Sequence, residues 1–219
     1  MRTNHHLDDA TIMSFAAGTL PAPLSLVVSA HLGFCSQCRE RVRKAEVIGS
    51  AVLEQIEPAK MSPGALNNVL ERLDAPSPAP MISVNVAEPE DTIYPSKIRR
   101  ALGLPVSEIK WRSVARGVKL HEVDVGREHL GKLFLMKIAP GKALPAHGHG
   151  GMELTLVLSG SYTDKFGTYR RGDIADLDDD VEHQPIVDDG EECICVVASE
   201  HPAKFKGILP KIFQPLVGI

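Results

Sequence analysis

The sequence predicts two domains of different class, a small helical bundle followed by an antiparallel β-sandwich or barrel. Three observations support this division of the 219-residue chain. Apolar residues recur with helical spacing up to about residue 75, a proline-rich stretch follows, and short apolar or alternating runs separated by glycine-bearing turns begin near residue 105. We therefore expect a helical domain over 1–75, a linker over 76–95, a β domain over 96–200 and a tail over 201–219.

The composition is that of an ordinary globular protein, with 43% hydrophobic and 24% charged residues. The formal net charge of −4 provides no basic field, which argues against direct binding of nucleic acid. An apolar N-terminal stretch resembles a signal peptide, but Asp8 and Asp9 precede it, and Pro21 and Pro23 interrupt it. No run reaches the roughly 18 apolar residues of a membrane span. We expect a cytoplasmic protein with no membrane partner.

The first part of the chain has the apolar periodicity of three helices. A short helix contains Ile12, Phe15 and Ala16, and a second helix starts after Pro23. The apolar stripe of the second helix comprises Leu24, Val27, Val28, His31 and Cys35. A longer helix follows Cys35, and its apolar face comprises Val42, Ala45, Gly49, Val52, Leu53 and Ile56.

A fourth helix is predicted from Ser62 as N-cap and Pro63 in the first turn. Its apolar stripe comprises Leu66, Val69, Leu70 and Leu73. Three short helices offer little surface to cover such a stripe, so these residues are a candidate surface for a partner protein. The alternative is that the stripe closes the core of its own domain.

The four cysteines occur as two close pairs, and the first pair belongs to a candidate metal site. His31 and Cys35 lie four residues apart and project from one helix face, and Cys38 follows three residues later. Structural zinc takes four ligands, and His5 or His6 near the N-terminus could supply the fourth. The alternatives are small buried residues that bind no metal and a redox-active Cys-x-x-Cys dithiol.

The helical domain resembles the zinc-binding anti-sigma factors in its H-x3-C-x2-C pattern with an upstream histidine. The resemblance implies a four-helix domain that clamps an alternative sigma factor of the extracytoplasmic-function type. It also implies a structural zinc held by His6, His31, Cys35 and Cys38, since the spacing of the family favours His6 over His5.

The second candidate metal site lies in the β domain, in the pattern Gly141-x5-His147-x-His149-x3-Glu153-x6-Gly160. His147 and His149 are two residues apart on an extended strand, so both side chains point to one side. The glycines that follow permit a tight bend, which can return Glu153 to the same ion.

This pattern matches the first motif of the cupin family at every spacing, and the resemblance implies a β-barrel with His183 as the fourth ligand. Asp178, Asp180 and Val187 depart from the second cupin motif, which affects its turns more than its metal ligands. Three imidazoles and one carboxylate favour a divalent cation, with zinc as the expected ion and Mn, Fe or Ni as alternatives.

The second cysteine pair, Cys193 and Cys195, alternates with apolar residues, so both thiols share one face of a late strand. They are a possible redox pair if that face is the barrel interior. The alternative is that they are two small buried residues.

The combination of the two domains resembles the ChrR-type anti-sigma factors. This resemblance implies a protein that keeps a sigma factor silent, with a cupin metal needed for the response to oxidants such as singlet oxygen or organic peroxide. It implies no enzymatic activity and no catalytic residues. Two other hypotheses remain: a metal-dependent cupin oxygenase with a helical oligomerisation domain, and a sensor in which Cys35 and Cys38 oxidise and release zinc.

Overall fold

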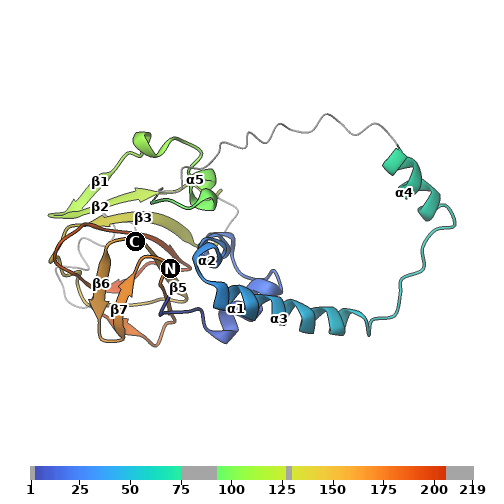
Figure 1. Cartoon of the computed structure of the whole chain (residues 1–219), viewed down its shortest axis with the longest axis horizontal. Coiled ribbons are helices and arrows are strands. Elements are labelled where there is room, and N and C mark those ends of the chain that lie inside the picture. The colour runs from blue at the N-terminus through green and yellow to red at the C-terminus, as the bar shows by residue number, and fades with distance from the viewer. Residues whose placement is uncertain (1–2, 75–92, 127–129, 206–219) are drawn as a thin grey trace.

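The computed structural model describes residues 3–74, 93–126 and 130–205. Within them, helices precede an antiparallel β-sandwich, which confirms the predicted fold class. Figure 1 shows α2 lying against the sheets, α3 extending away from them, and α4 standing apart from the other elements. No helix in the described ranges is both long and apolar enough to span a bilayer.

The first three helices are set by residues at their N-termini. Asp8 accepts a hydrogen bond from the backbone N–H of Thr11 and caps α1, and Pro23 lies in the first turn of α2. Cys35 ends α2 and also caps α3, because its sulfur accepts a hydrogen bond from the N–H of Cys38. The helices are α1 (Asp9–Ala16), α2 (Ala22–Phe34), α3 (Ser36–Leu53), α4 (Ala65–Asp74) and α5 (Ser96–Leu102), followed by the 3₁₀ turn η1 (Val106–Glu108).

The strands form three antiparallel sheets. The six-stranded sheet contains, in spatial order, β1 (Arg112–Ala115), β2 (Val118–Glu122), β3 (Lys132–Ile138), β11 (Cys193–Ser199), β5 (Glu153–Ser159) and β8 (Ile174–Leu177). The second sheet contains β10 (Ile186–Val187), β6 (Ser161–Asp164) and β7 (Gly167–Arg170), and the third contains β12 (Lys204–Phe205), β4 (His147–Gly148) and β9 (Glu182–His183).

The two faces of the six-stranded sheet belong to two different cores. Along β3 and β11, alternate residues point to opposite faces, as the pleat requires. Leu133, Leu135 and Val196 pack with α1–α3 and α5 in one cluster, whereas Phe134, Met136 and Val197 lie inside the sandwich in the other. The helices and the cupin sheet thus share one continuous core, in which Leu24, Val27 and Val28 of α2 are almost completely buried.

Only the first half of the predicted apolar face of α3 is buried. Val42 and Ala45 lie in the shared core, whereas Val52, Leu53 and Ile56 are exposed. α4 begins at Ala65, so the predicted N-cap Ser62 lies ahead of the helix. The predicted α4 stripe is exposed rather than closing a core of its own domain, with Leu66 at 67%, Val69 at 52%, Leu70 at 48% and Leu73 at 75%.

Asp176 on β8 joins the cupin to the N-terminal segment (residues 3–9) by accepting a hydrogen bond from the backbone N–H of Asp8, 3.0 Å away. Burial raises the pKa of Asp176 to about 6 from an ordinary value of 3.8, helped by the nearby charge of Asp8 and opposed by this hydrogen bond. Because the folded state disfavours the ionised carboxylate, its cost to stability is complete above about pH 6 and disappears as the pH falls toward about 4.

We therefore expect Asp176→Asn to stabilise the protein at about pH 7.5, by up to about 3 kcal/mol, because the amide keeps an acceptor oxygen and cannot ionise. The gain should shrink at about pH 4.5, where the wild-type carboxyl is largely protonated. Urea unfolding at both pH values, with the same zinc concentration, measures this difference. The exposed Asp179→Asn is the control, and a loss of stability at the higher pH would contradict the assignment.

Candidate metal centres

The first candidate centre is formed by His6, His31, Cys35 and Cys38, whose ligand atoms all lie within 4.8 Å of one another. The Nδ1 atom of His6 is 3.2 Å from the sulfur of Cys35 and 3.7 Å from that of Cys38. Zinc bound tetrahedrally at ordinary Zn–N and Zn–S lengths would separate such atoms by about 3.5 Å. The arrangement therefore fits a four-coordinate structural ion.

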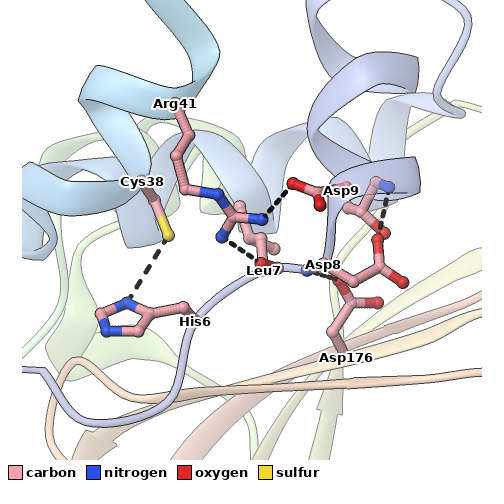
Figure 2. Close-up of polar contacts among 8 residues, drawn as sticks. His6, Leu7, Asp8, Asp9, Cys38, Arg41 and Asp176 are labelled. Atoms are coloured by element: carbon pink, nitrogen blue, oxygen red, sulfur yellow. Dashed lines mark hydrogen bonds and ion pairs between the residues drawn. The ribbon is translucent and has the colours of Figure 1, made fainter.

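The local fold explains how these ligands meet. α2 carries His31 in its last turn, Cys35 joins α2 to α3, and Cys38 lies in the first turn of α3. The N-terminal segment runs past this junction, and the His6 side chain lies beside the two thiols. Arg41 on α3 holds the segment by donating hydrogen bonds to the backbone oxygen of Leu7 and to the carboxylate of Asp9, as Figure 2 shows.

The neighbouring histidine has a different environment. The Nε2 atom of His5 is 3.1 Å from the backbone oxygen of Thr168, and its ring stacks on Tyr169 with 4.0 Å between centroids. His5 therefore faces the cupin, while His6 faces the two thiols.

Burial sets the protonation of the first group. It lowers the pKa of His31 to about 4, so this ring is neutral near pH 7. Burial also raises the pKa of Cys38 to about 11, whereas hydrogen bonds from Thr3 and the Cys38 backbone outweigh burial and lower the pKa of Cys35. The Nδ1 atom of His31 donates to the Gly172 carbonyl, 2.9 Å away, and its buried Nε2 has no hydrogen-bond partner among the described residues. A bound cation would use this lone pair and stabilise both thiolates.

The second candidate centre is formed by His147, His149, Glu153 and His183, all of which are buried. His147 and His183 stand opposite each other in the register of β4 and β9. His149 follows β4, and Glu153 is the first residue of β5. Glycines make the bend between them possible, because a Cβ atom at Gly151 would lie 2.6 Å from a carboxylate oxygen of Glu200.

The hydrogen bonds around the second group fix its imidazole tautomers. The Nδ1–H of His147 donates to the Pro145 carbonyl, 2.9 Å away, and Nδ1 of His183 lies 2.8 Å from the carboxylate of Asp164. The remaining Nε2 lone pairs of these two rings face each other at 3.2 Å. Two lone pairs at this distance repel each other unless a cation lies between them, so the geometry fits a metal ion.

The electrostatic environment of the second group also suits a cation. Burial alone would raise the pKa of Glu153, but the interaction with the His149 imidazole, whose Nδ1 lies 3.6 Å from the carboxylate, and the other two imidazoles outweigh it and lower that pKa. Burial lowers the pKa of His183, opposed by the bond to Asp164. Neither ring nitrogen of His149 has a hydrogen-bond partner among the described residues. The group therefore offers three imidazoles and one carboxylate to a divalent ion.

A cavity of about 590 Å³ lies beside His183. Its lining comprises Ala146, Thr163, Asp164, Lys165, Glu182, His183, Gln184, Ile186 and Asp188. Lys165 and the acidic residues contribute polar groups to the lining, although most of its exposed surface is apolar. A small molecule with both polar and apolar groups could therefore reach the neighbourhood of the second centre.

Cys193 and Cys195 point into the sandwich interior, in the same cluster as Phe134 and Tyr162. Both thiols are buried, and neither forms a disulfide. Interaction with the Cys193 thiol and burial raise the pKa of Cys195. Neither thiol belongs to the second metal group, whose ligand atoms come from the four residues named above.

The sequence did not single out three residues that support the centres. Asp164 orients His183, the carbonyl of Gly172 orients His31, and Asp173 holds the backbone ahead of His6. These residues lie far along the chain from the ligands that they serve, so no local spacing relates them. No local signal in the sequence marks Asp164, whose carboxylate is buried only by the fold.

Comparison with known proteins identifies relatives over the whole chain. The model of the ChrR cupin-like domain matches residues 100–203. Anti-sigma-E factor ChrR of Cereibacter sphaeroides is 36% identical over 221 residues, which cover 100% of each chain. The crystal structure of Rhodobacter sphaeroides SigE in complex with the anti-sigma ChrR matches with a TM-score of 0.73 and 34% identity, over 90% of this chain and 99% of that chain.

The matched residues include both the helical and the β region. The chain therefore belongs to the ChrR family of anti-sigma factors.

Proposed function

We propose that this chain binds a sigma factor of the extracytoplasmic-function type and keeps it from engaging RNA polymerase. Membership of the ChrR family supports this proposal, because the matched crystal structure is that of SigE in complex with ChrR. The chain then acts as a binding regulator in the cytoplasm, with a protein partner and no catalytic residues.

The observation that carries the proposal is the exposure, among the described residues, of two apolar stripes, one at and just beyond the end of α3 and one on α4. We call the two stripes together the clamp surface, which comprises Val52, Leu53, Ile56, Leu66, Val69, Leu70 and Leu73. Each of these side chains is at least 48% exposed. An apolar helical stripe without a cover is typical of helices that bind in a groove of a partner. In our proposal, the sigma factor covers this surface.

The two centres have different roles in this proposal. Zinc at His6, His31, Cys35 and Cys38 holds the junction of α2 and α3, from which the clamp surface extends, and such sites contribute on the order of 10 kcal/mol to folding. A second divalent ion, zinc or alternatively Mn, Fe or Ni, binds in the cupin. It is required for the response to singlet oxygen or organic peroxide, in which the complex with the sigma factor opens. The helical region 1–75 and the cupin region 96–200 divide these tasks.

Replacing an apolar residue of the clamp surface by a charge should weaken sigma binding. We expect Leu70→Asp to reduce affinity by about 30-fold or more, because the carboxylate would be buried in the interface without a partner. Titration with a sigma factor of the extracytoplasmic-function type, followed by co-purification, measures the loss. Asn68→Asp adds the same charge on the same helix outside the apolar stripe and should bind normally. Equal affinity of wild type and Leu70→Asp would contradict the proposed surface.

Removing one proposed zinc ligand should release one metal equivalent. We expect His6→Ala to lose about one zinc per chain, whereas His5→Ala keeps full stoichiometry, because only His6 reaches the thiols. Metal analysis of the purified variants measures this. The opposite result, with zinc lost from His5→Ala alone, would show that the ligand assignment is wrong.

Removing the cupin carboxylate should separate inhibition from response. We expect Glu153→Ala to bind the sigma factor but to retain it after treatment with singlet oxygen or an organic hydroperoxide, because the cupin ion is lost. Release of the sigma factor over time measures the response, and the exposed Glu191→Ala is the control. Release from Glu153→Ala at the wild-type rate would contradict the role of the cupin metal.

A second candidate function is that of a metal-dependent oxygenase, favoured by the cavity beside His183. It requires turnover of a small dicarbonyl or similar substrate by the metal-loaded chain, lost in Glu153→Ala. If metal-loaded protein that binds its sigma factor shows no turnover, the oxygenase function is rejected and the anti-sigma function is retained.

A further inference from the structure

The N-terminal metal group contacts the cupin as well as the helices that carry its ligands. The contacts converge on the turn between β7 and β8, which contains Gly172 and Asp173. The carbonyl of Gly172 accepts the hydrogen bond from Nδ1 of His31, 2.9 Å away. This bond fixes the His31 ring so that its other nitrogen faces the thiols.

Asp173 holds the second imidazole through the backbone. One of its carboxylate oxygens accepts hydrogen bonds from the N–H groups of Asn4 and His5, at 2.6 and 3.2 Å. Its other oxygen accepts from the N–H of Arg170, at 2.9 Å, which ties the carboxylate to its own turn. Asp173 is 2% exposed, so these bonds are sheltered from water. The residue that follows His5 is the ligand His6, so this carboxylate determines where His6 lies.

The N-terminal segment, defined as residues 3–9, is thus held from two sides. On the helical side, Arg41 binds the backbone of Leu7 and the carboxylate of Asp9. On the cupin side, Asp173 binds its start and Asp176 binds Asp8. Figure 2 shows the segment between the helices and the cupin, with Cys38 above His6 and Asp176 below Asp8.

Gly172 lets the cupin approach α2 and the N-terminal segment this closely. Its φ is +87°, and a Cβ atom there would lie 3.1 Å from Cβ of Phe34 and 3.2 Å from the methyl group of Thr3. Phe34 is the last residue of α2 and directly precedes the ligand Cys35. A side chain at position 172 would therefore push the cupin away from the metal group on both sides of the turn.

We infer that the β7–β8 turn of the cupin is part of the N-terminal metal centre, with Asp173 and the Gly172 carbonyl as positioning groups for His6 and His31. The inference rests on the proposed zinc site and adds a role for the cupin in it. The cupin positions His6 and His31, and the α2–α3 junction positions Cys35 and Cys38. The affinity for the metal and the docking of the helices on the cupin are therefore coupled. By linkage, zinc strengthens the docking by the same factor by which docking strengthens zinc binding.

Cobalt titration of the full-length protein tests this coupling. Only the N-terminal group contains thiolates among the two candidate centres, so the thiolate-to-cobalt charge-transfer band reports that centre alone. We expect Asp173→Ala and Gly172→Ala to weaken cobalt binding by about 10- to 100-fold, as is usual when groups that orient metal ligands are removed. Asp173→Asn keeps one acceptor oxygen and should recover most of the affinity.

Gly190→Ala is the matched control for the glycine substitution. Gly190 also has a positive φ, +115°, but a Cβ atom there meets no atom within 4 Å. Its substitution imposes backbone strain in the cupin without touching the metal group, so cobalt affinity should change by less than about twofold. A similar loss in Gly190→Ala and Gly172→Ala would overturn the inference, because general cupin strain would then explain both.

Hydrogen exchange provides a second test, whose main comparison is between the zinc-bound and the zinc-free wild-type chain. Zinc should slow amide exchange in residues 167–176, and this effect should disappear in Cys38→Ser, which lacks a ligand of the N-terminal centre only. Unchanged exchange, or unchanged cobalt affinity of Asp173→Ala, would overturn the coupling while leaving the zinc site intact. Absence of the charge-transfer band in wild type would instead overturn the zinc site itself.

Discussion

The packing of α2 on the outer face of the six-stranded sheet is the constraint on which the rest of the structure depends. Leu24, Val27 and Val28 fill this interface with Leu135 and Val196 from the sheet. Both surfaces are apolar, so separating them would expose a large part of the core to water. Because the position of α2 is fixed, His31 lies over the β7–β8 turn, and Cys35 starts α3 at a defined point beside the N-terminal segment.

The same sheet connects the two candidate metal centres. β8 follows Asp173 and carries Asp176, and it pairs with β5 from Leu156↔Ile174 to Glu153↔Leu177. Glu153 is a proposed ligand of the cupin ion, so a single strand pair joins the two sites. A change at the cupin centre that shifts β5 would act directly on the turn that positions His6 and His31. Communication between the two regions therefore has a short structural route through hydrogen-bonded strands.

Much of the fold and of both ligand sets could be predicted because the patterns are local. The spacing of His31, Cys35 and Cys38 follows from one helix end and the next helix start, and that of His147 and His149 follows from a strand. The docking of the helices on the cupin was not predicted, since Gly172 and Asp173 share no spacing with the N-terminal ligands. One signal was available: α2 also carries Leu26, Leu32 and Phe34 outside its main stripe, which is typical of a helix buried between two layers.

The division of α3 into a buried and an exposed half explains how the molecule can be both stable and open to a partner. Its first turns are fixed by Cys35, Cys38 and Arg41, and Val42 and Ala45 reach the shared core. Beyond Ala45 no other described element covers the helix, and its apolar residues are exposed, as are those of α4. A chain that buried this surface itself would gain stability but would lose the surface that a partner needs. The cupin and the proposed zinc provide the stability that the clamp surface does not contribute, and any loosening of the β7–β8 turn acts at the base of α3.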